Sequence, residues 1–175
     1  DLHLAALRKM GAEITEEGGV LECRVNGQLH GEEIRFPFVS VGATENVLIA
    51  ASTAKGITKI FNAACEPEIC DLAQFLVHCG AKVTGAGTSR ITVEGVPKLH
   101  GCEHRVIPDR IVAATYLFAA AVTGGDVTLT DVVPEHLSAV LPRLQETGCE
   151  LVTAGRQIRV RAQGRPRSLS AVLTA

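Results

Sequence analysis

The stretch that contains Ser40 and Gly42 is the part of this sequence best suited to binding a ligand. It follows a short strand pattern and leads into an alanine-rich helix predicted at residues 43–54. The first N–H groups of a helix lack internal partners and the helix dipole attracts anions, so a phosphate could bind there. Ser40 could cap the helix or offer its hydroxyl to that phosphate, and Gly42 would let a ligand approach the backbone. The residues alone favour a plain N-cap and leave the phosphate site open.

Charged pairs stand at two other predicted helix starts. Glu66 and Glu68 flank Pro67, which is favoured in a first helical turn, and carboxylates there suit the positive end of the helix dipole. Alone, this pattern indicates a structural role. Asp109 and Arg110 lie where one sequence unit gives way to the next. They could form a hinge contact or a solvated N-cap, and both interpretations remain open.

Other motifs that could carry chemistry fail the test of context. The glycine-rich residues 85–87 precede a strand and lack both a third Gly and a Lys-Ser/Thr pair, so they predict a hairpin turn rather than a phosphate loop. No Ser-His-Asp or Cys-His arrangement can be assembled. His100, Cys102 and His104 form an H-x-C-x-H pattern, but no second ligand cluster accompanies them. We therefore expect no metal site and no cofactor.

The cysteines show no C-x-x-C spacing, and three of them occupy apolar positions of a predicted strand or helix. We interpret all of them as reduced thiols in the core or at the surface, which is typical of a cytoplasmic protein. The six are Cys23, Cys65, Cys70, Cys79, Cys102 and Cys149.

The elements that position these residues repeat along the chain. An amphipathic helix that ends in Gly, a small residue, a charge and an aliphatic residue occurs three times. The glycines are Gly11, Gly80 and Gly148, at spacings of 69 and 68 residues. A fixed period of this size indicates one supersecondary unit used repeatedly. Each Gly is expected to adopt the left-handed conformation that ends a helix with little strain.

Each copy continues into a predicted hairpin, and the second and third copies are preceded by a strand, a helix and another strand. The unit is therefore strand-helix-strand-helix-strand-strand. The first copy lacks its first half, so we expect the chain to be an internal segment of a longer α/β protein. The predicted hairpins occupy residues 13–15 and 20–25, 82–84 and 91–94, and 150–153 and 158–160. The preceding elements are predicted at 34–36, 43–54 and 58–61 in the second copy, and at 105–107, 110–122 and 127–129 in the third.

Bulk composition excludes several classes of function. Of the 175 residues, 46% are hydrophobic but only 3% are aromatic, which indicates an aliphatic layered core. The net charge of −2 and the few aromatics exclude the basic, base-stacking surfaces of nucleic-acid binding proteins. The longest apolar run, residues 111–122, is shorter than the roughly 20 residues of a membrane span. We expect a cytoplasmic protein with no nucleic-acid or membrane partner.

Several stretches also match the motifs of a known family. Ser40 to Asn46 reads S-V-G-A-T-E-N, and residues 62–71 contain N-A-A-C-E-P-E. Residues 85–88 and 106–111 match too, and the start at Asp1 resembles the segment that follows R-P-V. On these motifs the chain resembles, over its whole length, the UDP-N-acetylglucosamine enolpyruvyl transferases. The sister family that makes enolpyruvylshikimate phosphate shares the fold but not these motifs.

The resemblance implies a two-domain inside-out α/β barrel, in which each domain gathers three units around a pseudo-threefold axis. Residues 1–107 would be part of the nucleotide-sugar and catalytic-loop domain, as half a unit plus one full unit. Residues 108–175 would be one unit of the second domain. The remaining units of the same chain are then the expected protein partners.

The resemblance also implies an activity and a site. The family transfers the enolpyruvyl group of phosphoenolpyruvate to the 3-hydroxyl of UDP-N-acetylglucosamine, the first committed step of peptidoglycan synthesis, and no cofactor is implied. Asp1 and Leu2 resemble residues that hold the uridine end, and His3 is a weaker candidate beside them. The residues that resemble the cradle for uracil, ribose and diphosphate are Phe38, Val39, Ser40, Val41 and Gly42. Glu66, Asp109 and Arg110 stay candidates for hinge or supporting contacts.

The resemblance places the catalytic residues of the family outside this segment, so we expect the segment alone to show no turnover. Some positions depart from the family pattern. Cys65 stands where a basic residue is usual, and Val112 and Ala113 replace a usual Glu-Gly. Two alternatives remain: a non-catalytic binding or scaffold module that reuses the fold, and the shikimate-pathway sister enzyme.

Overall fold

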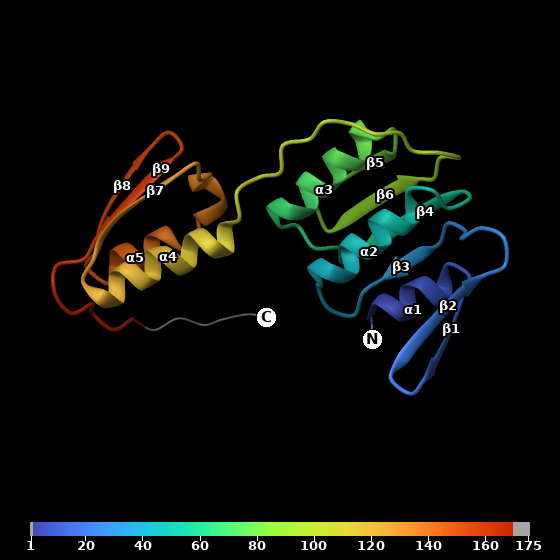
Figure 1. The fold of residues 1–175 in the computed structure, drawn as a ribbon, viewed down its shortest axis with the longest axis horizontal. Helices are drawn as coiled ribbons and strands as arrows, with labels where there is room; N and C mark the ends of the chain where they lie inside the picture. The colour runs from blue at the N-terminus through green and yellow to red at the C-terminus, as the bar shows by residue number, and fades with distance from the viewer. Residues whose placement is uncertain (1, 170–175) are drawn as a thin grey trace. The chain divides into compact units, whose positions relative to one another are not determined.

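The computed structural model describes residues 2–169 and is drawn as a ribbon in Figure 1. The chain divides into two compact units, Asp1–Val106 and Ile107–Ala175. Each unit has its own hydrophobic core. Helices and strands alternate in both, as expected for a mixed α/β protein.

The first unit contains three helices and six strands within the described residues. They are α1 (Leu2–Lys9), β1 (Ala12–Glu17), β2 (Val20–Val25), β3 (Glu33–Arg35), α2 (Val41–Ala51), β4 (Ile57–Phe61), α3 (Pro67–His78), β5 (Lys82–Thr84) and β6 (Arg90–Glu94). Strands β3, β4, β6 and β5 form one sheet in that order, in which β3 and β4 are parallel and the other pairs antiparallel. Strands β1 and β2 form a separate antiparallel hairpin.

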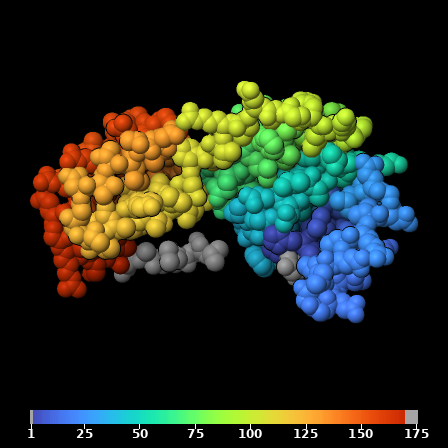
Figure 2. Space-filling view, in the orientation of Figure 1, coloured from blue at the N-terminus to red at the C-terminus, as the bar shows by residue number. Residues whose placement is uncertain are grey.

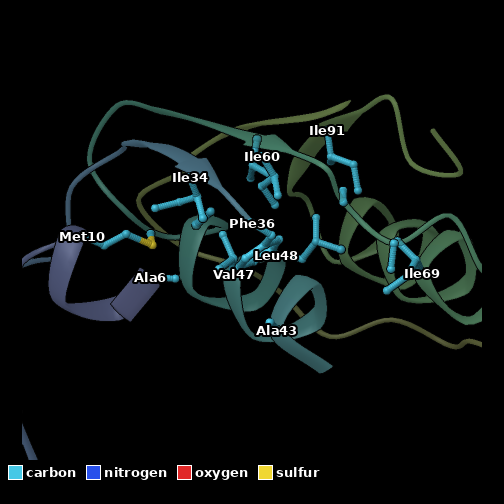
Figure 3. Close-up of a cluster of buried hydrophobic side chains, with 14 of the residues drawn as sticks. Ala6, Met10, Ile34, Phe36, Ala43, Val47, Leu48, Ile60, Ile69 and Ile91 are labelled. Carbon is cyan, nitrogen blue, oxygen red and sulfur yellow. The ribbon is translucent and has the colours of Figure 1, made fainter. Parts of the chain in front are cut away.

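The core of this unit lies between the four-stranded sheet and its helices. Ile34, Ile60 and Ile91 occupy facing positions on β3, β4 and β6, and all three are buried. Figure 3 shows this row meeting Val47 and Leu48 of α2. Successive strand residues face opposite sides of a sheet, so this one aliphatic row fixes which face the helices cover.

The β1–β2 hairpin adds little to that core. Every residue of β2 is exposed, including Val20 and Leu21. In Figure 2 the hairpin forms a blue lobe at the edge of the first unit. Its pairing is held by the regular antiparallel ladder from Ala12 opposite Val25 to Glu17 opposite Val20.

The second unit repeats this scheme with a three-stranded sheet in place of the four-stranded one. Its elements are α4 (Arg110–Thr123), β7 (Asp126–Thr130), the 3-10 helix η1 (Pro134–Leu137), α5 (Leu141–Glu146), β8 (Glu150–Ala154) and β9 (Gln157–Arg161). The strands form an antiparallel sheet in the order β7-β9-β8. Leu117 of α4 and Leu144 of α5 pack with Ile158 and Val160 of β9 in its buried core.

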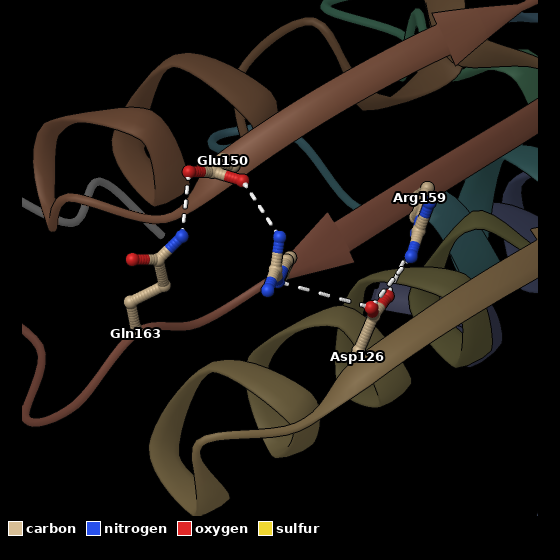
Figure 4. A network of polar contacts seen from close by, with 5 residues as sticks. Asp126, Glu150, Arg159 and Gln163 are labelled. Atoms are coloured by element: carbon tan, nitrogen blue, oxygen red, sulfur yellow. Dashed lines mark hydrogen bonds and ion pairs between the residues drawn. The ribbon is translucent and has the colours of Figure 1, made fainter.

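A charged network crosses one end of this sheet, where Asp126, Arg161 and Glu150 lie opposite one another (Figure 4). Both carboxylate oxygens of Asp126 on β7 accept hydrogen bonds from Arg159 on β9, at 2.7 and 2.6 Å. Arg161 lies 4.0 Å from Asp126 and 3.9 Å from Glu150 on β8, whose carboxylate also accepts from Gln163. The hydrogen bonds from Arg159 hold the pKa of Asp126 below its ordinary value. The network therefore ties the three strands together while Asp126 is ionised.

The repeat predicted from glycine spacing is confirmed. Gly11, Gly80 and Gly148 have φ of +102°, +98° and +93°, which ends each helix in the left-handed region. A further regularity was not predicted. In each copy, the carbonyl of the residue before the Gly accepts a hydrogen bond from the backbone N–H of a residue 19 or 20 positions beyond the Gly. The side chain of that donor residue packs over the Gly. The donors and acceptors are His30 to Met10, His100 to Cys79 and Arg167 to Thr147, at 3.0, 2.9 and 2.9 Å.

Three predicted elements differ from the structure. The strand expected at residues 105–107 is wrong, because residues 95–109 form no helix or strand and Val106 is 71% exposed. The predicted helix that ends at Gly148 is split into η1, which begins at Pro134, and α5, with Pro142 in its first turn, where the missing N–H is tolerated. Helix α2 begins two residues earlier than predicted, directly after Ser40.

Candidate functional site

The start of α2 is capped by Ser40. The hydroxyl oxygen of Ser40 accepts a hydrogen bond from the Ala43 N–H at 3.3 Å, and its extended backbone (φ −144°, ψ 118°) is that of an N-cap residue. The N-cap prediction is thus confirmed. By helix geometry the N–H groups of Val41 and Gly42 have no partner inside the helix, so they remain suited to an anionic ligand.

Thr44 connects this helix start to the loop after β4. Its hydroxyl donates to the Ser40 carbonyl at 2.8 Å and accepts from the Ala64 N–H at 3.1 Å. Thr44 and Ala64 are both fully buried. The hydroxyl therefore fixes Ser40 relative to the segment that follows β4. Sequence reasoning did not assign this role, since the partners lie 20 residues apart.

Asn62 fixes the other end of the same segment. It adopts a left-handed backbone (φ +58°), and its side-chain amide donates to the Phe36 carbonyl at 3.1 Å. The Phe36 N–H in turn donates to the Phe61 carbonyl at 3.1 Å. Residues 36–40 are thus held at one end by Asn62 and at the other by Thr44. Asn62 is a second positioning residue that the sequence analysis missed; its only local signal was an Asn between a strand and a helix, where the left-handed conformation is tolerated.

The first residues of α1 lie against the start of α2. The His3 imidazole hydrogen-bonds with the side-chain amide of Asn46, and its Cε1 lies 3.2 Å from the position that a Cβ on Gly42 would take. Gly42 is therefore small because His3 packs over it. His3 and Gly42 are almost 40 residues apart in the sequence, and the structure brings these two predicted site residues into contact.

A cavity of about 310 Å³ lies beside these residues, between α1 and β3. Leu2, Phe36 and Pro37 supply apolar walls, and Lys9 and Arg35 supply cationic side chains. Arg35 is placed over the Phe61 ring at 3.7 Å and pairs with Glu33 at 3.4 Å. Lys9 lies 4.0 Å from Glu32, so both cations have a carboxylate neighbour. The cavity places apolar surface beside polar, charged groups, a combination found in small-molecule sites.

Phe38 and Val39 are exposed on the segment that leads to Ser40. Their exposed fractions are 63% and 48%, which is high for apolar side chains next to a buried core. Together with the partly buried Val41 they form an apolar approach to the helix start. Asp1, the remaining residue of the predicted substrate site, lies outside the described residues.

The candidate supporting residues lie at other helix starts. Glu66 precedes α3 without a side-chain cap bond, and within residues 2–169 its buried Oε2 has no hydrogen-bond partner. Asp109 caps α4, since its Oδ1 accepts from the N–H groups of Ile111 and Val112 at 2.7 and 3.0 Å. Of the two interpretations of Asp109, the N-cap is confirmed. Arg110 is the first residue of α4, and a hinge role for it stays a prediction.

The H-x-C-x-H residues do not converge. His100 packs over Gly80, Cys102 lies against Cys79, and His104 pairs with Asp71 at 3.0 Å. Within residues 2–169 no group of three or more His, Cys, Asp or Glu side chains is placed to hold a metal ion. None of the helices in that range has the length and apolar character needed to cross a bilayer.

Comparison with known proteins agrees with the motifs in the sequence. Residues 1–173 match the EPSP synthase (3-phosphoshikimate 1-carboxyvinyltransferase) family. The chain is 49% identical, over 99% of its length, to UDP-N-acetylglucosamine 1-carboxyvinyltransferase 2 of Caldanaerobacter subterraneus subsp. tengcongensis. It is 53% identical, over 94% of its length, to UDP-N-acetylglucosamine 1-carboxyvinyltransferase of Afipia carboxidovorans. These matches cover 42% and 38% of the two relatives, so the chain spans about two fifths of their length.

Solved structures give the same fold. The enolpyruvyl transferase NikO from Streptomyces tendae superposes with a TM-score of 0.76 at 16% identity, covering 94% of this chain and 42% of NikO. An EPSP synthase from Acinetobacter baumannii superposes with a TM-score of 0.62 at 29% identity, covering 94% of this chain and 39% of that one. The repeat units, the α/β fold and the sequence match agree, and the chain belongs to the EPSP synthase family of enolpyruvyl (carboxyvinyl) transferases.

Proposed function

We propose that the protein containing this chain transfers the enolpyruvyl group of phosphoenolpyruvate to the 3-hydroxyl of UDP-N-acetylglucosamine, with release of phosphate. The observation that carries this proposal is the difference in identity between two kinds of relative. The chain is 49% and 53% identical to UDP-N-acetylglucosamine 1-carboxyvinyltransferases but 29% identical to an EPSP synthase. The acceptor is therefore the nucleotide sugar, and the product enters peptidoglycan synthesis.

The geometry at the start of α2 supports a role in holding the nucleotide sugar. The N–H groups of Val41 and Gly42 and the helix dipole favour the diphosphate. Ser40 supplies a hydroxyl beside them, while its capping bond to Ala43 keeps that hydroxyl in place. Phe38 and Val39 offer exposed apolar surface for the uracil and ribose.

The uridine end is assigned to the region where α1 meets the cavity beside β3. Leu2 lines that cavity together with Arg35, and Asp1 precedes it in sequence. His3 closes over Gly42 and so limits how deeply a ligand approaches the backbone there. Asp1, Leu2 and the segment from Phe38 to Gly42 form our proposed contribution of this chain to the substrate site.

No residue of this chain is assigned a catalytic role. Enolpyruvyl transfer with release of phosphate needs preorganised cations and a proton-transfer group near the reacting atoms. Glu66, Asp109 and Arg110 are proposed only to support the site or the connection between units. The remaining units of the same protein are its proposed structural partners.

We also propose that the protein works in the cytoplasm. The six cysteines of this chain all lie in the described residues and carry unpaired thiols, as is usual in a reducing compartment.

The proposed reaction is tested by offering the complete protein two acceptors. Phosphate release from phosphoenolpyruvate is measured with UDP-N-acetylglucosamine, with 3-phosphoshikimate and with no acceptor. We expect release only with the nucleotide sugar. Release only with 3-phosphoshikimate would instead support the sister enzyme, and no release with either acceptor would support a non-catalytic module.

A further inference from the structure

Two cysteine sulfurs lie close together away from the proposed substrate site. The Sγ atoms of Cys79 and Cys102 are 3.5 Å apart, although the residues are separated by 23 positions in sequence. Cys79 follows α3 as its C-cap and is only 6% exposed. Cys102 is partly exposed, lies in the irregular segment of residues 95–109, and lines a cavity of about 520 Å³. One sulfur is thus buried, and its neighbour is open to small molecules.

Specific contacts hold this irregular segment against α3. The His100 N–H donates to the carbonyl of Cys79 at 2.9 Å. Beyond Cys102, the His104 ring pairs with Asp71 of α3 at 3.0 Å, with side chains only 9% and 12% exposed. The His104 ring also packs edge-on against Phe75, with ring centroids 5.5 Å apart. Cys102 is therefore tethered on both sides, which keeps its sulfur near that of Cys79.

We propose that Cys79 and Cys102 form a reversible redox pair that hydrogen peroxide converts to a disulfide. A disulfide places its sulfurs about 2.05 Å apart, so the two atoms must approach by roughly 1.5 Å. Cys102 can supply this movement because it lies outside any helix or strand. Cys79 is held in place because it is buried at the C-cap of α3 and its N–H donates to the Phe75 carbonyl.

The reaction balances with peroxide as the oxidant. The Cys102 thiolate attacks one peroxide oxygen, the O–O bond breaks, and the departing hydroxide takes up a proton to become water. The Cys79 sulfur, as thiolate, then attacks the sulfur of the resulting sulfenic acid, and a second hydroxide leaves as water. The two thiols lose two protons and two electrons, and one peroxide becomes two waters.

The local environment sets the pH dependence of this reaction. Loss of solvent around Cys102, followed by its hydrogen bond with Cys79, raises the pKa of its thiol above the ordinary value. Because the thiolate is the nucleophile, oxidation should be slow at neutral pH and accelerate as the pH rises toward that pKa. The ionisable side chains around this segment include Asp71, His78 and His104. His100 packs over Gly80, next to Cys79, and Glu45 and Glu68 line the same cavity as Cys102.

The disulfide would fasten residues 95–106 to the end of α3. The contacts that hold them there at present include the His100 hydrogen bond, the His104–Asp71 ion pair and the packing of His104 against Phe75. Backbone amides around His100 should therefore exchange hydrogen more slowly after oxidation. The proposal is independent of the assigned activity, since neither sulfur belongs to the substrate site.

The test treats the complete protein with hydrogen peroxide at pH 7 and pH 9 and maps disulfides under non-reducing conditions. Combined cleavage by trypsin and by a protease that cuts before Asp separates Cys70 from Cys79. We expect the peptide of residues 71–82 joined to that of residues 99–105, with a mass about 2 Da below the sum of the two. Dithiothreitol should reverse the linkage, and more of it should form at pH 9.

Matched variants identify the pair. Cys102→Ser and Cys79→Ala should both lose the linkage, whereas Cys23→Ser, at an exposed position on β2, should retain it. The disulfide is mapped directly in the wild-type protein, so the proposal can still be tested if a variant fails to fold. Linkage of Cys65 to Cys70 alone, or peroxide treatment that leaves 71–82 and 99–105 unjoined at both pH values, would overturn the proposal.

Discussion

Ser40 makes hydrogen bonds through both its hydroxyl and its backbone carbonyl at the proposed diphosphate site. Its hydroxyl caps α2 through Ala43, and its carbonyl accepts from both the backbone and the hydroxyl of Thr44. The capping bond is local, and the Thr44 bond leads on to Ala64 in a distant loop. The position of Ser40, and with it that of the proposed diphosphate site, therefore depends on a buried hydroxyl that contacts no ligand.

Replacing Thr44 with Val should disturb this link. The substitution keeps the shape of the side chain but leaves the buried Ala64 N–H without an acceptor, which costs about 1–3 kcal/mol of folding stability. We expect a lower urea midpoint and faster hydrogen exchange at the Ala64 amide. Thr44→Ser, which keeps the hydroxyl, is the control. Equal exchange rates at Ala64 in both variants would show that the hydroxyl does not hold this loop.

The sequence was a good guide to Ser40 and a poor one to Thr44 and Asn62. An N-cap depends on residues within one turn, so its type and position are visible locally. Thr44 acts on a residue 20 positions away and Asn62 on one 26 positions away. Such partners meet only after the strands pair, and a single sequence contains no record of that pairing.

At the scale of elements, helices and strands were predicted correctly where the local sequence pattern and the tertiary packing favour the same structure. The helix ends at Gly11, Gly80 and Gly148 and the three hairpins form as predicted, because left-handed Gly and alternating apolar residues act over a few positions. Residues 105–107 look like a strand, yet they have no neighbouring strand in the structure and precede Pro108. A strand needs a partner, and the apolar run alone could not reveal that none is present in residues 2–169.

The charged network on β7, β8 and β9 should give the second unit a measurable acid sensitivity. The pKa of Asp126 is lowered in the folded state, chiefly by its hydrogen bonds from Arg159. The stabilisation is therefore complete above the unfolded pKa of about 3.9 and is lost as the pH falls through the lower folded value.

Comparison of wild type with Asp126→Asn isolates this contribution from that of other carboxylates. The variant should be less stable near neutral pH, and the difference should close as the pH falls below about 4. Hydrogen exchange of the β7 and β9 amides between pH 3 and 7 provides the measurement. A difference that stays constant across that range would mean that the ionised Asp126 does not stabilise the sheet.

At the scale of the molecule, some predictions from the sequence concern this chain and others concern the longer protein that contains it. Composition indicated an aliphatic layered core, and the structure has two such cores, one in each unit. The glycine period indicated repetition, and the left-handed conformation of all three glycines confirms it. The assignment of the two units to two domains of a longer enzyme, and the absence of turnover in this segment alone, stay predictions because the chain spans about two fifths of its relatives.

The central claim is that the start of α2 holds the diphosphate of the nucleotide sugar. It is tested most directly by binding UDP-N-acetylglucosamine to the complete protein carrying Ser40→Asp or Ser40→Asn. Both Asp and Asn cap helices well, so both variants should fold with similar stability. Only Asp places a negative charge beside the proposed site. Calorimetry should show affinity reduced roughly tenfold or more by Asp and much less by Asn. Equal affinity for the wild type and the Asp variant would contradict the account.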